Sequence, residues 1–396
     1  MSSWRLKYTL IPGADANNSK LTLFIAILGA VSLFYILLVW NFDKTPDAKA
    51  NWIPKRKLNR EGVDDPIFFN PNKATTRAKN AETKIAIVMI VTNDTNPENY
   101  DAAIKSVQCY SKIHNYAFVL AVDTDFNCSH QDKFFRRHCA AAKILPLYDA
   151  ILFLDADIGI INPKRKIEEF MSDGIDVTFY DRFYNWEIMA GSYIARSTKY
   201  SLDLLNEFAD YEFKLPKSFH GTDNGALHIF LAEKLFPEMD VEIEICRQVY
   251  TISVDYADLF TYEACIRAIM GSGTDFGRVR IMRKGTGWAR DGWLTTMLWH
   301  PELDFMFHGL KMNQLKETPA VPLKPHQMGR SQWYNFLLGP IDLNKCSPSN
   351  STWFYDPRLI GNKTEILGSL KDFRRRVAID QVNSYSRMTG VLSRWF

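Results

Sequence analysis

The sequence predicts an α/β protein built on a mostly parallel β-sheet with helices on its faces. Short apolar runs alternate with helical stretches from residue 85 to residue 235, as happens when strands and helices alternate along a parallel sheet. Several of the apolar runs end in carboxylate or hydroxyl side chains. With 46% apolar and 13% aromatic residues, the 396-residue chain can also fill a large core.

The first 80 residues are expected to anchor the protein and to extend it from a membrane. Residues 1–20 are predicted to form a short cytosolic tail. Residues 21–40 carry no charge and are almost wholly apolar, which suits an α-helix that crosses a bilayer. Trp40, Asn41 and Phe42 are not the small residues of a signal-peptide cleavage site, so an uncleaved anchor is favoured. Residues 41–80 are polar and contain several prolines, as in a stem or linker.

The part of the chain after this span is expected to face the lumen of the secretory pathway. Lysines and arginines flank the span on both sides and do not settle its orientation. All six cysteines follow it, as do glycosylation sequons that begin at Asn93, Asn127, Asn350 and Asn362. Chance sequons and buried thiols are the alternative. The cysteine spacings show no metal-binding pattern, and six cysteines can pair in many ways, so no pairing is assigned.

A globular domain is predicted over residues 81–375, with a C-terminal tail over residues 376–396. The expected strands are residues 85–91, 117–122, 151–154, 176–180 and 190–195. The expected helices are residues 100–113, 131–145, 202–211 and 224–235. Beyond about residue 240 the pattern is irregular and rich in Trp, Gly and Arg. The net charge of +3 and the lack of a long basic stripe give nucleic-acid binding little support.

Asp155 and Asp157 directly follow the apolar run at residues 151–154. Side chains on a strand repeat every second residue, so the two carboxylates are expected to point the same way. Hard divalent cations such as Mg²⁺ or Mn²⁺ prefer such oxygen ligands. A turn or solvated loop could also contain this pair. Thr92 and Asp94 follow an earlier strand, and ligands of parallel sheets bind at the carboxyl ends of the strands.

A histidine, a glycine and a lysine far downstream could complete such a site. His308 follows an apolar stretch and precedes Gly309 and Lys311. An imidazole can complete a carboxylate set for Mn²⁺, a glycine allows a phosphate to approach the backbone, and an ammonium can neutralise a diphosphate. The alternative for His308 is a structural role beside its apolar neighbours.

Together these residues resemble the GT-A glycosyltransferases, in which an Asp-x-Asp motif at a strand end binds a divalent metal that holds a nucleotide-sugar diphosphate. In the retaining families related to glycogenin and the galactosyltransferases, a C-terminal His-x-Gly-x-x-Lys supplies the third ligand and a phosphate contact. The matching stretch here, 308–311, is shorter by one residue on each side of Gly309. The resemblance implies a Rossmann-like GT-A fold.

Wider stretches over roughly residues 82–375 resemble an uncharacterised nucleotide-diphospho-sugar transferase family abundant in nematodes. They are residues 191–193, 219–227 and 287–295. The resemblance implies that Asp223 and Asn224 contact the donor sugar, that Gly191 and Ser192 meet it through the backbone, and that Asp291 lies near it. Thr92 and Asp94, at the end of the first strand, are placed to contact the base or ribose, and the resemblance implies that Lys143 faces the diphosphate. The alternatives are a helix cap at Asp223, a packing glycine at Gly191 and a solvated charge at Lys143.

The sequence therefore predicts a single-pass type II membrane protein of the Golgi or ER whose luminal domain is a metal-dependent glycosyltransferase. It would use Mn²⁺ or Mg²⁺ and move a hexose, with UDP favoured as the nucleotide, to a glycan, glycoprotein or glycolipid acceptor. The resemblance favours retention of configuration, and inversion, in which Asp223 or Asp291 would deprotonate the acceptor hydroxyl, stays open. Asp223 and Asp291 are the candidate catalytic carboxylates. Two alternatives stay open: a catalytically inactive luminal carbohydrate-binding protein, and an aspartyl-phosphate phosphatase, which would have Thr or Val where this chain has Gly159.

Overall fold

The computed structural model describes residues 85–325, 333–348 and 353–394. The cytosolic tail, membrane helix and stem predicted over residues 1–80 lie outside these residues. Within the described residues, no helix combines the length and the apolar character needed to cross a bilayer.

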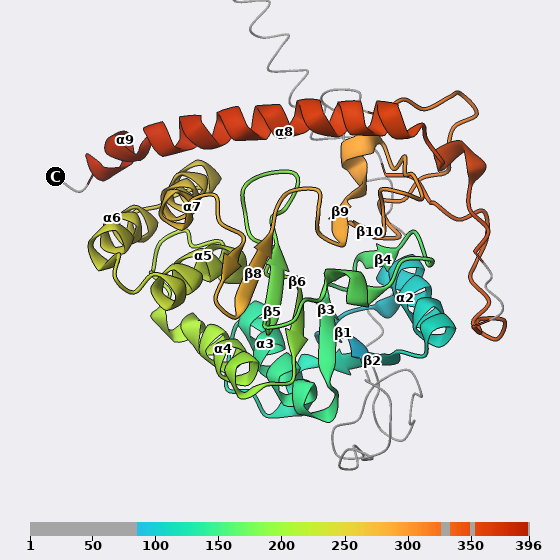
Figure 1. Ribbon diagram of the computed structural model, residues 1–396, viewed down its shortest axis with the longest axis horizontal. Coiled ribbons are helices and arrows are strands. Elements are labelled where there is room, and N and C mark those ends of the chain that lie inside the picture. The colour runs from blue at the N-terminus through green and yellow to red at the C-terminus, as the bar shows by residue number, and fades with distance from the viewer. Residues whose placement is uncertain (1–84, 326–332, 349–352, 395–396) are drawn as a thin grey trace, which may run out of the picture. The chain divides into compact units, whose positions relative to one another are not determined.

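The described chain forms a seven-stranded sheet in the order β2-β1-β3-β6-β5-β8-β7 (Figure 1). Its strands are β1 (Ile85–Val91), β2 (Ala117–Val122), β3 (Ala150–Leu154), β5 (Val177–Tyr180), β6 (Ser192–Arg196), β7 (Asp275–Phe276) and β8 (Val279–Met282). Strand β6 is antiparallel to β3 and β5, and β7 is antiparallel to β8, while the other five strands share one direction. The expectation of a mostly parallel sheet is confirmed.

Helices occur at each position predicted before residue 240. They are α2 (Asp101–His114), α3 (Lys133–Ile144), α4 (Lys199–Asp210) and α5 (Thr222–Leu235). Short 3₁₀ helices lie between the main elements: η2 (Pro97–Tyr100), η3 (Asp123–Phe126), η4 (Leu145–Leu147), η5 (Ile167–Phe170), η6 (Tyr211–Lys214), η7 (Gly292–Thr295) and η8 (Pro357–Leu359). The alternation of strand and helix in this half follows the local hydrophobic pattern.

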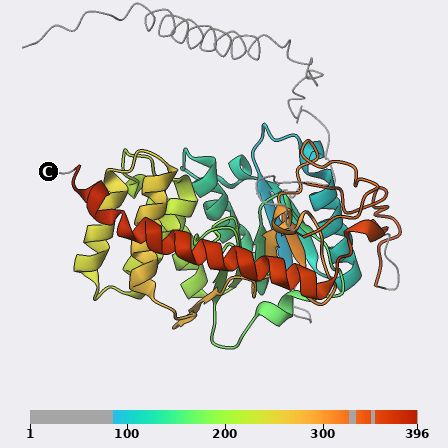
Figure 2. The same cartoon turned by 90° about the horizontal axis from the view of Figure 1, so that it is seen from above.

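The irregular sequence pattern beyond about residue 240 predicts no particular elements. The chain forms α6 (Asp240–Thr251), α7 (Tyr256–Met270), α8 (Lys363–Ser386) and α9 (Met388–Leu392) there. Helix α7 is buried on most sides and α8 is largely exposed, so neither shows the one-sided apolar stripe that identifies a surface helix. The tail boundary predicted after residue 375 falls inside α8. Figure 2 shows α8 as one long helix, and Val391 beyond it is buried in the core.

The sheet is covered on both faces, which explains why its strands are continuous apolar runs. Along β1, Ala86 and Val88 pack into one core cluster, while Ile87 and Met89 pack into another. Residues of α3 to α7 contribute to the first cluster and residues of α2 to the second. The carboxyl ends of the strands are therefore the part of the sheet left free to form a site.

A second, three-stranded sheet connects distant parts of the chain. Its strands are β4 (Ile158–Ile160), β10 (Met306–His308) and β9 (Ala289–Asp291), in that spatial order. Strand β10 pairs antiparallel with β4 and parallel with β9, so that His308 lies opposite both Ile158 and Asp291. Because β4 begins one residue after Asp157, this register carries His308 and Asp291 to the end of β3.

All six cysteines form disulfides, which the sequence alone did not pair. The bonds join Cys109 to Cys346, Cys128 to Cys139 and Cys246 to Cys265. The first ties α2 to the C-terminal part of the chain, and the last joins α6 to α7. Disulfides form and persist in oxidising compartments and constrain the unfolded chain. Cys128, Cys139 and His130 also lie close together, but the disulfide occupies both sulfurs.

Candidate active site

The carboxyl ends of β1, β2 and β3 meet at a cavity of about 270 Å³. Thr92 lines it from the end of β1, Asp123 from the end of β2, and Asp155 and Asp157 from the end of β3. Its remaining lining residues are Ile90, Val91, Thr95, Tyr100, Lys133, Phe134, Arg137, Ala156 and Lys311. The strand ends thus converge as the sequence predicts, at the usual ligand edge of an α/β sheet.

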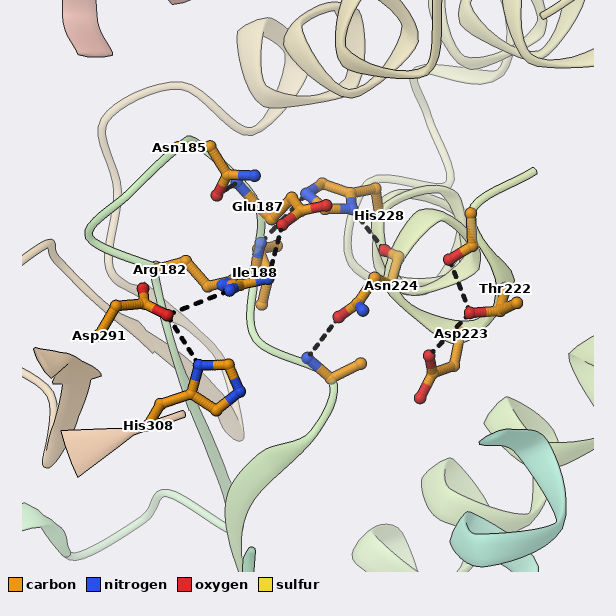
Figure 3. Close-up of polar contacts among 12 residues, drawn as sticks. Arg182, Asn185, Glu187, Ile188, Thr222, Asp223, Asn224, His228, Asp291 and His308 are labelled. Carbon is orange, nitrogen blue, oxygen red and sulfur yellow. Dashed lines mark hydrogen bonds and ion pairs between the residues drawn. The ribbon is translucent and has the colours of Figure 1, made fainter. Parts of the chain in front are cut away.

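Asp155, Asp157 and His308 form a group, the carboxylate–histidine trio, whose ligand atoms all lie within 4.8 Å of one another. His308 Nε2 is 3.4 Å from Asp157 Oδ1. His308 Nδ1 donates to Asp291 Oδ1 at 2.7 Å (Figure 3), so Nε2 is the nitrogen that faces the carboxylates. Burial opposes protonation of His308, but Asp157 and Asp291 outweigh it and raise its pKa above the ordinary value.

The trio fits a divalent cation such as Mn²⁺ or Mg²⁺ in donor type and in charge. Two carboxylates and an imidazole suit Mn²⁺ and related ions. The salt bridges that surround the trio join five carboxylates to three permanent cations: Asp155, Asp157, Glu187, Asp223 and Asp291 with Arg137, Arg182 and Lys311. Among the groups that these salt bridges join, carboxylates outnumber permanent cations by two. Burial, with a further contribution from Asp157, raises the pKa of Asp155 despite the opposing Arg137.

Arg137 of α3 links the trio to Asp223. Its guanidinium donates to Asp155 Oδ1 and, at 2.6 Å, to Asp223 Oδ2. Asp223 is fully buried and also lies 3.1 Å from His138 Nε2. Burial opposes ionisation of Asp223, but Arg137 and the His138 hydrogen bond lower its pKa to about 2. Asp223 is therefore an ionised carboxylate that holds Arg137 against Asp155.

The start of α5 sets the direction of Asp223 and Asn224. Gly221 and Thr222 both adopt the left-handed conformation, with φ of 64° and 53°. A β-branched residue such as Thr222 rarely does so, and strain of this kind is characteristic of functional sites. The N-cap residue of α5 is Gly221, which makes no side-chain cap hydrogen bond, so the capping alternative for Asp223 is not realised. Asn224 Oδ1 instead accepts from the Ala190 amide at 3.4 Å (Figure 3).

Asp291 supports the trio from the second sheet. Besides His308, it contacts Arg182, whose Nη2 lies 3.3 Å from Asp291 Oδ1. Arg182 Nη1 also donates to Glu187 Oε2 at 3.2 Å (Figure 3). Asp291 is buried, so its carboxylate orients the His308 ring and faces no open space in the cavity. Such outer carboxylates fix the tautomer of a ligating histidine and raise its basicity.

Two predicted glycines shape the trio through the backbone. The Asp155 amide donates to the Gly191 carbonyl at 2.8 Å, and a Cβ added to Gly191 would overlap the Asp155 carboxylate. Gly309 has φ of 97°, and a Cβ there would meet the Trp333 ring. Its amide donates to the Asp157 carbonyl at 3.0 Å. Gly309 therefore positions Asp157, with its amide already engaged.

Of three further predicted residues, Thr92 and Lys311 line the cavity and Asp94 contacts Thr92. Thr92 lines the cavity, and its hydroxyl donates to Asp94, which is exposed. The Lys311 ammonium is 3.3 Å from Asp157 Oδ2, and its side chain is 41% exposed. It can therefore reach both the trio and a ligand in the cavity.

The predicted residues Ser192 and Lys143 do not line the cavity, and their side chains are engaged elsewhere. Ser192 is fully buried in β6 and accepts a hydrogen bond from Trp288 Nε1 at 2.8 Å. The Lys143 ammonium donates to the carbonyls of Phe126 and Asn127 at 2.7 and 3.1 Å. Lys143 thus holds the chain near η3 in place.

Sequence reasoning missed Arg137, Phe134 and Tyr100, which line the cavity. The first two lie three residues apart on α3 and therefore share a helix face, whereas Lys143, six residues beyond Arg137, does not. Knowing which face of α3 points to the strand ends would have selected Arg137. Tyr100 lies at the end of η2, where the sequence shows no distinctive signal.

A family model described as "Protein of unknown function, DUF273" matches residues 107–325. No curated protein matches the chain. Among solved structures, the chain is similar to a glycosyltransferase involved in the glycosylation of the major capsid of PBCV-1, with 16% identity, 57% of this chain and 93% of that chain covered, and a TM-score of 0.37. It is also similar to A197 from STIV, with 14% identity, coverages of 38% and 78%, and a TM-score of 0.23.

Proposed function

This chain belongs to the family described as a protein of unknown function, DUF273, and from its own site we propose that it is a metal-dependent glycosyltransferase. The donor would be a nucleotide-diphosphate hexose, with UDP favoured, and the acceptor a glycan, glycoprotein or glycolipid. The observation that carries the proposal is the carboxylate–histidine trio, with ligand atoms within 4.8 Å of one another, whose two aspartates line the cavity at the ends of three parallel strands.

The residues of the cavity divide the proposed work by their chemistry. Asp155, Asp157 and His308 would hold Mn²⁺ or Mg²⁺, whose charge would offset that of a diphosphate. Lys311, which is half-exposed beside Asp157, would bind a phosphate oxygen. Thr92 and Tyr100 line the same cavity and would contact the nucleoside. In such a transfer the anomeric bond to the diphosphate breaks, an acceptor hydroxyl takes its place and loses its proton, and the nucleotide diphosphate leaves.

The two candidate catalytic carboxylates act, in this proposal, as positioning residues. Asp223 holds Arg137 and Asp291 holds His308, and both carboxylates are buried. Their ionised state keeps the partner cations and the imidazole oriented toward the trio. Retention of the anomeric configuration stays a prediction from the resemblance.

We also propose that the protein works in the Golgi or ER lumen, anchored by residues 21–40. The three disulfides favour an oxidising compartment. Asn93, Asn127 and Asn362, which begin three of the sequons, are exposed and therefore open to modification.

Nucleotide binding by the purified full-length protein tests the proposal. Calorimetric titrations with UDP and GDP, with and without Mn²⁺, would compare wild type with Asp157→Asn. We expect UDP to bind only with Mn²⁺, and the variant to lose more than about 100-fold in affinity. Asp203→Asn is the matched control, because Asp203 is an exposed carboxylate on α4 that pairs with Lys199.

Two results would contradict the donor site. Wild-type affinity in Asp157→Asn would show that the trio does not hold the nucleotide. Failure of the folded wild-type protein to bind any nucleotide with Mn²⁺ would favour the non-catalytic carbohydrate-binding alternative. Release of UDP from a UDP-sugar, measured with the same variants, then separates turnover from binding.

A further inference from the structure

A second cavity, of about 780 Å³, adjoins the one that contains the trio. Phe134 lines both cavities. The second cavity lies between the loop around Arg182 and Glu187, the start of α5, and the start of α7 at Tyr256. Its volume lies in the range of ligand-binding cavities in proteins. The proposed metal and nucleotide occupy the first cavity, which leaves this second cavity without an assigned ligand.

Aromatic rings form the walls of this second cavity and are held in place by one another. Tyr256 is 64% exposed, and its ring packs edge-on against Phe219 with centroids 4.8 Å apart. The Phe260 ring also lies near Tyr256, with centroids 5.9 Å apart. Tyr184 is 37% exposed and packs edge-on against Trp293 at 5.7 Å. Large aromatic faces fixed in this way present a preorganised surface to a ligand.

Polar groups beside the rings are left available for hydrogen bonds. Among the described residues, no hydrogen bond uses the hydroxyl of Tyr184 or Tyr256. His220 Nδ1 accepts from the Thr222 amide at 3.1 Å, which leaves Nε2 free to act as a donor. Asn224 uses its side-chain oxygen on Ala190, and its NH₂ group has no partner within the described chain. Donors and acceptors of this kind match the hydroxyls of a sugar.

The charge of the cavity favours a neutral ligand. Arg182 and Glu187 are the only Arg, Lys, Asp or Glu residues among the described side chains that line it, and they pair with each other at 3.2 Å. An anionic or cationic ligand would therefore find no unpaired partner. The aromatic faces attract the weakly positive C–H groups on the apolar side of a pyranose, because the face of an aromatic ring is negative.

We propose that this second cavity, the aromatic cavity, binds a neutral glycan. Its role as the acceptor site rests on the proposed glycosyltransferase function. Two links join it to the trio: Phe134, and the chain of contacts from Arg182 through Asp291 to His308. A bound glycan would thus lie next to the donor cavity and present a hydroxyl toward it.

Binding of neutral oligosaccharides to the full-length protein tests this inference. An array of neutral glycans identifies a bound oligosaccharide, and calorimetry with that compound then compares wild type with Tyr256→Ala and Tyr256→Phe. We expect Tyr256→Ala to weaken binding at least about tenfold and Tyr256→Phe to keep most of it, since the ring face remains. Tyr385→Ala is the matched control, because Tyr385 is an exposed tyrosine of α8 outside the aromatic cavity.

The outcomes separate this inference from the proposed function. Tyr256→Ala should still bind UDP with Mn²⁺, and Asp157→Asn should still bind the glycan. Equal glycan affinity of Tyr256→Ala and wild type would overturn the inference and leave the donor site untouched. So would the absence of any neutral glycan binding at millimolar concentration, or binding of peptides alone on a matching peptide array. If Asp157→Asn bound UDP as tightly as wild type, the proposed function would be overturned, and the binding of a glycan to the aromatic cavity would not.

Discussion

The two cavities that meet at Phe134 differ in the forces that form them. The cavity beside the trio is lined by ion pairs, in which Asp155 contacts Arg137 and Asp157 contacts Lys311. The aromatic cavity is lined by ring faces and neutral polar groups, with a single internal ion pair. The cavity beside the trio is suited to a charged ligand bound by ion pairs. The aromatic cavity is suited to a neutral ligand bound by shape complementarity and hydrogen bonds.

The difference teaches how each cavity should respond to mutation. Buried charges are costly to desolvate, and removing one partner leaves another uncompensated. The cavity beside the trio, called the charged cavity from here on, should therefore lose ligand affinity sharply when one of its charged side chains is changed. The aromatic contacts are spread over several rings, and each aromatic pair contributes about 0.5–1.5 kcal/mol of interaction free energy beyond that of its buried area. The following predictions, in order of expected effect, test this contrast.

Gly191→Ala should weaken ligand binding more than any other change considered, and its effect should be confined to the charged cavity. The added Cβ would overlap the Asp155 carboxylate, so Asp155 must leave the trio. We expect more than about 100-fold weaker Mn²⁺-dependent UDP binding by calorimetry, with glycan binding unchanged.

Gly368→Ala is the control for this change, since a Cβ at Gly368 of α8 meets no atom within 4 Å. Alanine is favoured there by about 1 kcal/mol in a helix. Equal loss of UDP and glycan binding in Gly191→Ala would show that the two cavities are not independent.

Asp291→Asn should weaken Mn²⁺ binding in the charged cavity to an intermediate degree and glycan binding in the aromatic cavity to a smaller degree. The change removes the negative charge that orients His308 and holds Arg182. Loss of such an outer carboxylate typically weakens metal binding 10- to 100-fold, which a Mn²⁺ titration followed by electron paramagnetic resonance would measure. Wild-type Mn²⁺ affinity would mean that Asp291 does not support the trio, and Asp203→Asn again serves as the control.

Glu263→Gln should have the smallest effect and should change stability alone. Glu263 of α7 is fully buried, and neither carboxylate oxygen has a partner among the described residues. Burial, reinforced by Glu187, raises the pKa of Glu263 well above its ordinary value. The folded state therefore keeps a proton that the unfolded chain loses above about pH 4.3, so the stability contributed by Glu263 falls as the pH rises through and beyond that value.

Thermal unfolding at pH 5 and pH 8 tests this pH dependence. Glutamine cannot ionise, so the melting temperature of Glu263→Gln, taken relative to wild type, should be higher at pH 8 than at pH 5. Each 1 kcal/mol of change in the free energy of unfolding should shift the melting temperature by about 2–4 °C. The exposed Glu238→Gln should show no such trend. A constant difference between Glu263→Gln and wild type would contradict the assigned protonation of Glu263.

The sequence by itself determined the strands of the large sheet up to residue 196, the α-helices up to residue 235, and the edge of that sheet where the site lies. Apolar runs such as residues 85–91 and 151–154 are local signals, and they place Asp155 and Asp157 at a strand end whatever the rest of the chain does. The same logic brought Thr92 to the cavity. Beyond residue 240 the local signal fails, because α7 is buried on most sides and α8 is largely exposed.

Only the tertiary structure decided which partners the two aspartates have. The register of β10 with β4 and β9 brings His308 and Asp291 to Asp157, and the packing of α3 selects Arg137 over Lys143. The disulfide pairing and the aromatic cavity also join segments distant in sequence. Hydrophobic periodicity acts over a few residues, whereas ion pairs, ligand sets and cavity walls depend on which surfaces meet when the whole core packs.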